Sequence, residues 1–422
     1  MPIQQKNRVM GVKTPLDDDL LLLQSVNAKE LMSGLFEYTL DLVSEAPDID
    51  FNELVGEQMT VRFEMAGGET RFFNGYVSRF SQAGFEDTLS KYQATLVPWL
   101  WFLTRTSDCR IFQNMKIPDV IKNVFRENGF SDFEDLLTEE YREWENCVQY
   151  AETDFNFVSR LMEQEGISYY FTQEADKHTL VLSDSYNAHQ SKEGYEIVPF
   201  FPPDSTAIRE RDHISAWSTS RQVQPGVYVH NDFDFKKPKK VLESKTSTPR
   251  KHAASDYEIF FYPGEYTEKA DGENYSKVRL QELQARFETF EGSGNVQGLS
   301  AGCLFELENL PREDQNGEYL VTSIHYKLES DRFGSGETAG GATFQCQFSS
   351  ISSKESFRPG KQTPKPKVQG LQTAIVVGKA GEEIWTDEFG RVKVQFHWDR
   401  YGNSDENSSC WVRVAQVWAG KK

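Results

Sequence analysis

The chain has 422 residues, and its 46 Lys and Arg against 65 Asp and Glu give a net charge of −19 and a pI of about 4.9. A protein this acidic repels nucleic acid and anionic lipid, so neither is expected as a partner. Hydrophobic residues make up 38% of the chain and aromatic residues 13%, which excludes global disorder and favours packed, β-rich cores. At roughly 150 residues per domain, the length predicts several domains.

No segment has the pattern of a membrane span or a secretory signal. The longest apolar stretch, Val97 to Leu103, is interrupted by Pro98 and is far shorter than the ~18 residues that a span needs. Leu20 to Leu23 is too short for the apolar region of a signal peptide and follows three aspartates. The sequence therefore predicts a protein made in the cytoplasm without a signal peptide and without stable membrane insertion.

The first hundred residues alternate between polar and apolar side chains, which predicts β-strands. The expected strands cover residues 20–26, 36–43, 61–65, 73–80 and 92–101. Gly67-Gly68 separates the third from the fourth and predicts a hairpin turn. This part is expected to form a small β-barrel or a strongly curved sheet.

Three amphipathic helices interrupt the strands. The first covers Ile117 to Phe125, with Pro118 near its start and Gly129 past its end. The second covers Asp154 to Glu165 and stops at Gly166, before a strand at 167–171; its expected core residues are Phe157, Val158, Leu161 and Met162. The third is expected over 274–290, and its apolar face comprises Leu280, Leu283, Phe287 and Phe290. All three are interpreted as helices that face a core.

Two stretches have the composition of linkers or long loops. Residues 236–251 carry seven Lys and Arg against one Glu, and residues 352–370 carry five Lys and Arg with three prolines. The second is the better domain boundary, because a strand-rich unit follows it. In that unit, residues 391–399 and 411–418 alternate as strands do, which is typical of an OB barrel, although only three or four strands fit.

Two short motifs imitate catalytic or nucleotide-binding signatures. Gly298 to Gly302 matches G-x-S-x-G, with Ser300 in the nucleophile position. That elbow needs a strand before the serine and a helix after it, whereas here we expect a helix before it and a strand at 304–307 after it. Gly334-x-Gly336-x-x-Ala339 precedes a predicted strand rather than a phosphate-binding helix, so it is interpreted as a hairpin loop.

Other kinds of site are not indicated either. No histidine has a His or Cys neighbour at metal-ligand spacing, and His397 is expected on the polar face of its strand. The carboxylates of Glu382, Glu383, Asp387 and Glu388 lie beside a glycine turn, which favours a solvated hairpin tip over the opposed acids of a glycosidase. Residues 371–422 hold four tryptophans but equal numbers of basic and acidic residues, so the basic groove of a single-strand binder is missing. Five scattered cysteines predict buried free thiols. The sequence thus predicts no catalytic residue, no metal and no cofactor.

Two stretches are specific to one protein family. The first is AETDFNFVSRLMEQEGISYYF at 151–171, and the second is VVGKAGEEIWTDEFGRVKVQFHWDRYGNSDENSSCWVRVAQVWAG at 376–420. Together with PREDQNGEYLVTSIHY at 311–326, they resemble the VgrG spike proteins of type VI secretion systems, and the resemblance covers essentially the whole chain. Within the first stretch, Arg160 and Glu163 are three residues apart on one helix face, and we expect them to pair. Ile167 is expected to be buried.

The resemblance implies a fold that is mainly β with inserted α+β parts: two barrel-like hub domains of the phage-tail-hub type, then a truncated OB-fold barrel. The expected domains are a first hub domain at 1–105, an α+β insert at 106–205, a second hub domain with the helix 274–290 at 206–355, a Pro/Lys linker at 356–370 and an incomplete OB domain at 371–422. Family members normally continue into a triple-stranded β-helix, so this chain is expected to lack a C-terminal part.

The resemblance also implies a function. It predicts a homotrimer that caps the secretion tube, binds the tube protein and the baseplate, and is secreted by the type VI machine to puncture a target-cell membrane. A tip protein or effectors would bind through the missing C-terminal part. Two alternatives remain: a contractile-phage tail hub, which shares the fold, and a spike with peptidoglycan hydrolase activity. The second would need an inserted domain with two opposed carboxylates, and no insertion of ~150 residues separates the hub part from the OB strands.

Overall fold

The computed structural model describes residues 4–86, 88–203, 211–331, 342–382 and 385–415. The chain divides into two compact units. Unit 1 comprises Met1–Trp101, Asp132–Glu139 and Gly166–Gly360, and unit 2 comprises Phe102–Ser131, Glu140–Glu165 and Lys361–Lys422. The expected mainly β content is present, as are the two helices expected between residues 106 and 205.

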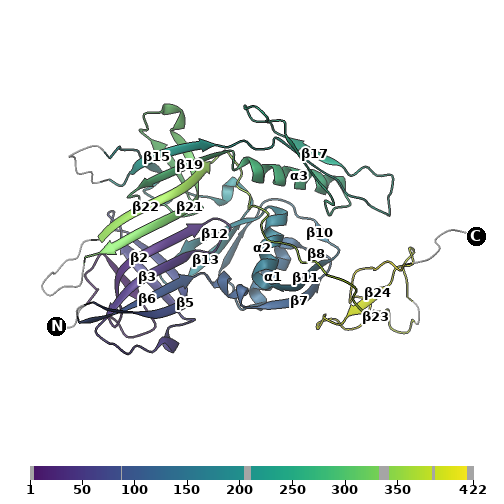
Figure 1. Cartoon of the computed structure of the whole chain (residues 1–422), viewed down its shortest axis with the longest axis horizontal. Helices are drawn as coiled ribbons and strands as arrows, with labels where there is room; N and C mark the ends of the chain where they lie inside the picture. Colours follow the sequence, from purple (N-terminus) through teal and green to yellow (C-terminus); the bar gives the residue numbers. More distant parts are fainter. Residues whose placement is uncertain (1–3, 87, 204–210, 332–341, 383–384, 416–422) are drawn as a thin grey trace, which may run out of the picture. The chain divides into compact units, whose positions relative to one another are not determined.

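One large, largely antiparallel sheet dominates unit 1 (Figure 1). Its strands follow the order β1-β4-β5-β6-β3-β2-β21-β22-β19-β15, and β20 pairs with β21 and β14 beside this path. The N-terminal strands are β1 (Met10–Lys13), β2 (Leu22–Leu31), β3 (Glu37–Ser44), β4 (Gln58–Glu64), β5 (Thr70–Glu86) and β6 (Leu89–Val97). The later strands are β14 (Ile197–Pro199), β15 (Ile214–Arg221), β19 (Glu288–Gly294), β20 (Leu304–Glu308), β21 (Gly317–Ser330) and β22 (Ala342–Ser352).

The two halves of this sheet meet where β2 pairs with β21. Ala28 lies opposite Tyr326 in that pair, so residues nearly three hundred positions apart in the sequence share one ladder. The expected mainly β fold with inserted helices is therefore confirmed. The boundaries expected between the two hub domains stay a prediction, because the sheet runs through both.

The expected hairpin at Gly67-Gly68 is confirmed, and it connects β4 to β5. In β4, Val61 and Phe63 are buried, whereas Arg62 between them is partly exposed, as the alternating pattern predicted. Gly68 has φ +87°, a left-handed conformation that glycine adopts without the steric cost of a Cβ atom. Its N–H donates to the carbonyl of Met65 at 2.9 Å, which closes the turn.

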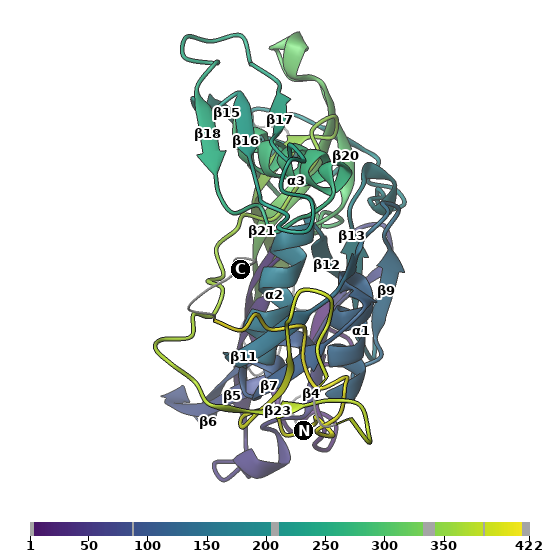
Figure 2. The same cartoon turned by 90° about the vertical axis from the view of Figure 1, so that its right-hand side faces the viewer.

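Unit 1 carries two smaller three-stranded sheets. One has the order β12-β13-β9 and is built from β12 (Ser168–Gln173), β13 (His178–Ser183) and β9 (Phe133–Leu136). The other has the order β17-β16-β18 and is built from β16 (Val227–His230), β17 (Ser244–Ser247) and β18 (Glu258–Phe261). Helix α3 (Lys269–Gln284) packs against β16 and β17, as Figure 2 shows. We call residues 222–287, which lie between β15 and β19, the α3 subdomain.

Unit 2 contains the other two helices, α1 (Ile117–Glu127) and α2 (Asp154–Glu165), packed against each other (Figure 2). The bounds of α2 are those predicted, and Pro118 lies in the first turn of α1 as expected. The strands of this unit are β7 (Ser107–Phe112), β8 (Met115–Lys116), β10 (Glu143–Trp144), β11 (Cys147–Thr153), β23 (Ala374–Val377) and β24 (Lys393–Phe396). β11 pairs with β7, β10 with β8, and β23 with β24.

The third helix differs from its prediction. It covers Lys269–Gln284 rather than 274–290, and Phe290 lies in β19 instead. The reason is long-range pairing, because β19 forms ladders with both β15 and β22. The strand expected to reach Trp101 likewise ends at Val97, and Trp99–Thr104 forms a 3-10 helix. In each case the apolar pattern in the sequence continues beyond the end of the helix or strand, because tertiary contacts give the following residues a different backbone conformation.

The two stretches interpreted as linkers are partly folded. Residues 236–251 contain β17 and the buried Leu242, which forms a small core with Tyr266 and Tyr275. In the second stretch, the buried Arg358 donates from Nη1 to the carbonyl of Gly166 at 2.8 Å. The polar composition of the two stretches does not reveal these contacts, because a few buried side chains are enough to hold an irregular segment in place.

The C-terminal segment is less regular than its alternation predicted. The expected strand at 391–399 is reduced to β24, and Gln395, which alternation places on the same face as His397, is buried. The expected strand at 411–418 contributes an isolated bridge between Val412 and Val392, and its residues from 416 on lie outside the described residues.

Candidate functional site

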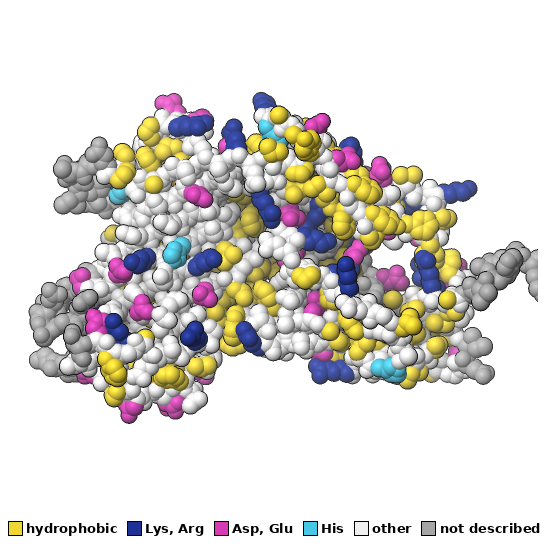
Figure 3. Space-filling model, in the orientation of Figure 1, with side chains coloured by type: hydrophobic (Ala, Val, Ile, Leu, Met, Phe, Trp, Pro, Cys, Tyr) yellow, Lys and Arg dark blue, Asp and Glu magenta, His cyan; other side chains and the backbone are white. Residues whose placement is uncertain are grey.

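The outward face of the large sheet in unit 1 is polar over several strands. Strand register places one row of side chains across five strand pairs: Glu37, Lys29, His325, Gln347, Ser293 and Ala216. A neighbouring row comprises Ser323, Ser349, Glu291 and Ser218. Over β2, β21 and β22, Figure 3 shows mostly white atoms, which belong to the backbone and to uncharged polar side chains, with isolated charges. This face can form many hydrogen bonds but concentrates no charge of either sign.

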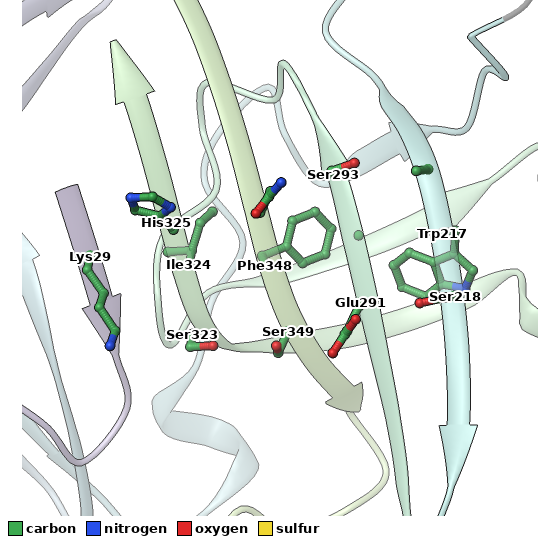
Figure 4. A pocket seen from close by; sticks show the side chains of 13 residues that line it. Lys29, Trp217, Ser218, Glu291, Ser293, Ser323, Ile324, His325, Phe348 and Ser349 are labelled. Carbon is green, nitrogen blue, oxygen red and sulfur yellow. The ribbon is translucent and has the colours of Figure 1, made fainter. Parts of the chain in front are cut away.

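A shallow hollow of about 520 Å³ lies on this face, between β2 and β15 (Figure 4). His325 lies beside it and its Nε2 is 2.6 Å from Oδ1 of Asn27. The rings of Trp217 and Phe348 lie at its floor and belong to the aromatic core beneath. Lys29, Glu291 and the serines come from different strands and do not converge on a single point in Figure 4. The hollow offers polar contacts and lacks the paired acid and base of a catalytic site.

A buried polar cluster lies beneath a second hollow of about 420 Å³ in unit 1. Arg71 Nη2 and Glu30 Oε1 are 4.0 Å apart, and Tyr38 donates to the same carboxylate at 2.9 Å. Arg71 also donates to the hydroxyl of Tyr326 at 2.6 Å. Burial raises the pKa of both tyrosines well above the usual value. The phenols therefore stay protonated, and the cluster stabilises the interior of the sheet rather than supplying a base.

Ser300, the candidate nucleophile of G-x-S-x-G, lines this second hollow. The segment before it is β19 and a loop, not the helix that we expected, because α3 ends earlier than predicted. Strand β20 follows it as predicted, where a nucleophile elbow would need a helix. Among the described residues, no histidine hydrogen-bonds its hydroxyl; its N–H contacts Sγ of Cys303 at 3.2 Å. The arrangement does not support a nucleophile.

The expected pair between Arg160 and Glu163 is wrong. Arg160 reaches back from α2 to Glu152 in β11, with Nε 2.9 Å from Oε2 and Nη2 2.6 Å from Oε1. Its Nη2 also donates to the carbonyl of Val148 at 2.7 Å. Strand β11 runs directly before α2 and offers a carboxylate in a forked geometry that fits a guanidinium better than a helical neighbour does. Arg160 thus fixes the helix to its own strand.

Glu163 holds a different segment. Its Oε2 accepts hydrogen bonds from the backbone N–H groups of Gln362 and Thr363 at 3.0 and 2.9 Å, and its Oε1 accepts from the Thr363 hydroxyl at 2.7 Å. In the same motif Gly166 directly follows α2; it has φ +75°, and a Cβ added to it would lie 2.5 Å from Val278. Phe157, Leu161 and Ile167 are buried as predicted. The family-specific stretch is therefore a set of structural contacts.

The other candidate residues do not form a site. His397 is exposed, as are Glu382 and Glu388; Asp387 accepts from Arg391 Nε at 2.6 Å, and Glu383 lies outside the described residues, as does the loop with Gly334 and Gly336. Within the described residues no group of three potential ligands could hold a metal ion, and no helix is long and apolar enough to cross a membrane. The five cysteines are free; Cys109 and Cys410 are only partly buried.

The polar sheet face was not predicted as a surface of interest. Its signal was present as alternation in β21 and β22, where polar residues occupy every second position over 323–329 and 343–349. That pattern shows which residues face outward but not that the strands of two distant segments form one continuous face, because strand pairing is not encoded locally.

Comparison with known proteins identifies consistent relatives. The family of the phage tail baseplate hub (GPD) matches residues 29–331. The type VI secretion system spike proteins VgrG1a and VgrG1c of Pseudomonas aeruginosa are 52% and 51% identical over 99% and 100% of this chain, which spans 65% and 58% of their lengths. A solved Escherichia coli component of the type VI secretion system, similar to the T4 phage tail proteins gp27 and gp5, aligns with a TM-score of 0.64 at 18% identity, covering 93% of this chain and 89% of that one. This last likeness concerns the fold.

Proposed function

We propose that this chain, which belongs to the phage tail baseplate hub family and within it to the VgrG spike proteins, is a structural hub of a type VI secretion machine. The observation that carries the proposal is identity above 50% along the whole chain to proteins named as spikes. The polar networks of Arg160 and Glu163 support it, since they hold elements of the fold together. In this role the hub caps the secretion tube, contacts the baseplate and is expelled with the tube to puncture a target membrane.

A trimer is the assembly proposed for this hub. The large sheet ends at β1 and β15, and open sheet edges invite pairing with another chain. The β1 edge is covered within the chain, because the Gln5 side chain bonds both the N–H and the carbonyl of Val12. Along β15, residues 216–221 pair on one side only, with β19, among the described residues. The open edge of β15 can accept a strand from another chain, and three copies are proposed because the family resemblance implies a trimer.

The assembly can be tested by light scattering at several protein concentrations. One chain has a mass of 48.5 kDa, and a particle of three times that mass is expected at high concentration. Pull-down with the cognate type VI tube protein should retain the assembled form. A chain that stays monomeric and binds no tube protein would contradict the hub role.

A hydrolase is the alternative that chemistry can test directly. We expect purified protein to leave peptidoglycan intact, and Ser300→Ala, His397→Ala and Glu383→Ala to leave secretion unchanged. A cleared zone on peptidoglycan that one of these changes abolishes would overturn the structural role.

A contractile-phage tail hub is the other alternative, supported by the phage family match. The two are distinguished by partner: binding to a phage tube protein but not to the type VI tube protein would favour the phage hub.

A further inference from the structure

Strand β11 of unit 2 contains a bulge where the family-specific stretch begins. Its pairing with β7 shifts between Gln149 and Glu152. The two residues between them, Tyr150 and Ala151, lie opposite Cys109 alone. Ala151 has φ +48°, a left-handed conformation that residues with a Cβ atom rarely adopt, and its N–H lies 3.3 Å from Sγ of Cys109. Bulges redirect side chains, and a strained residue inside one indicates a role for the new direction.

The bulge changes the face on which each side chain lies. In a regular strand Gln149 and Glu152 would point to opposite faces, because side chains alternate. With the extra residue both are buried, and Glu152 pairs with Arg160 of α2. Ala151 is exposed and Tyr150 is half-buried, so both lie on the outer side of the hairpin. One strand thus has an inner contact to α2 and an outer aromatic ring.

That outer ring contacts the part of unit 2 that comes last in the chain, residues 361–415, which we call the 361–415 segment. The Tyr150 hydroxyl accepts a hydrogen bond from Nε2 of Gln372 at 2.7 Å. The rings of Tyr150 and Trp398 meet edge to face, with their centroids 5.4 Å apart. Trp398 Nε1 donates to Oε1 of the same glutamine at 3.1 Å. Each of the three side chains therefore contacts the other two.

Asp108 in β7 holds a second part of the 361–415 segment. Its Oδ2 accepts hydrogen bonds from Arg400 Nη2 and from the Tyr401 hydroxyl, each at 2.7 Å. Its Oδ1 accepts from the N–H of Cys109 at 2.8 Å. The side chain of Asp108 is 14% exposed, so this charge-assisted contact is shielded from water on the hairpin side. Because Asp108 lies opposite Glu152, it borders the bulge directly.

The 361–415 segment has little of its own to keep it ordered. Among its described residues, Val394 is the only hydrophobic side chain that is buried. Leu371, Ile375 and Val376 are exposed. Its two strands, β23 and β24, have four residues each, and an isolated pair of strands is at best marginally stable in water. The order of the segment therefore depends on contacts with the rest of unit 2.

We propose that the bulged hairpin of β7 and β11 is the seat that orders the 361–415 segment. Glu163 holds the start of the segment at Gln362, and the seat holds its later part through Gln372, Trp398 and Arg400. The proposal rests on the hub function, to which it adds the surface that passes the push of the hub to its last segment. The α+β part of unit 2 carries this surface.

The test is amide hydrogen exchange of the full chain, followed by mass spectrometry of its peptides. The double variant Asp108→Ala/Tyr150→Ala removes both contacts of the seat. The matched control is Asp119→Ala, which removes an exposed ion pair with Lys122 on α1 of the same unit. We expect exchange in peptides from 371–401 to become about tenfold faster or more in the double variant, because the lost hydrogen bonds no longer oppose local opening. Exchange in α1 and α2 should stay as in the parent, and the control should leave all of these peptides unchanged.

A second pair of variants tests the bulge itself. Ala151→Gly keeps the left-handed conformation without steric cost, whereas Ala151→Val opposes it, because a β-branched side chain is strongly disfavoured there. We expect faster exchange over 371–401 in Ala151→Val only. Equal exchange in the two variants would show that the bulge does not position the seat.

Two results would overturn the seat and leave the hub function standing. One is exchange over 371–401 that stays at the parent rate in Asp108→Ala/Tyr150→Ala, since the segment would then be ordered by other contacts. The other is equally faster exchange in α1 and α2, since the hairpin would then support the whole of unit 2 rather than the segment. Failure of the hub function has a different signature: the parent chain would bind no tube protein, while its 371–401 peptides kept their seat-dependent protection.

Discussion

Arg160→Ala tests a buried ion pair of unit 2. Arg160 and Glu152 form three hydrogen bonds, at 2.6 to 3.1 Å between guanidinium nitrogens and carboxylate oxygens. Both side chains are at most a tenth exposed. Removing the arginine leaves a buried carboxylate without its counter-charge, and such a loss costs about 3–5 kcal/mol. The carbonyl of Val148 loses a donor at the same time.

The chain contains a matched control for this change. Arg221 pairs with Glu288 at 2.7 Å, but the arginine is 64% exposed and the pair is screened by water. Arg221→Ala should therefore cost under ~1 kcal/mol. The double variant Arg160→Ala/Glu152→Ala should recover part of the stability lost in Arg160→Ala, because it removes the stranded charge.

Urea unfolding followed by circular dichroism measures these differences, with the first transition assigned to the unit that carries the variant. Equal destabilisation by Arg160→Ala and Arg221→Ala would refute the reasoning, as would a double variant less stable than the single one. If Arg160→Ala kept its stability and its oligomeric state but lost export, the residue would contact a partner instead.

Three further changes test other parts of the structure. Leu161 is 2% exposed, so Leu161→Ala should destabilise the protein by about 2–5 kcal/mol through the cavity it leaves, measured in the same urea series; a loss below ~1 kcal/mol would contradict its core position. Burial lowers the pKa of His178 from 6.5 to about 3, so the unfolded chain takes up a proton that the folded chain does not, and stability should fall as pH drops from about 6.5 towards 3; His178→Gln should show a shallower fall, and identical slopes would count against a buried neutral imidazole. Burial raises the pKa of the Cys147 thiol to about 12, so iodoacetamide at pH 8 should modify it only after unfolding, as peptide mass mapping would show.

The sequence alone determined the elements whose cause is local. Helix α2 was predicted to the residue because its apolar period, its flanking strand and Gly166 all lie within fifteen positions. The hairpin at Gly68 followed from a glycine pair between alternating strands, and its left-handed φ explains why. Strand β20 after Ser300 also followed from the local pattern, whereas the helix expected before Ser300 did not, because α3 ends at Gln284.

Tertiary structure decided what depends on distant partners. The end of α3 could not be predicted from the sequence, because Phe287 and Phe290 continue the helical spacing of apolar residues. In the structure this part of the chain leads into β19, which pairs with β15 and β22. Arg160 pairs with Glu152 rather than Glu163 because the fold places β11 against α2. Spacing along the helix predicts only partners on the same helix. The joining of β2 to β21 arises from a pairing between residues nearly three hundred positions apart. Local patterns predict which face of a strand is polar. Which strands become neighbours, and therefore which strand edges stay unpaired, depends on the whole fold, because each pairing needs its partner strand to be in place.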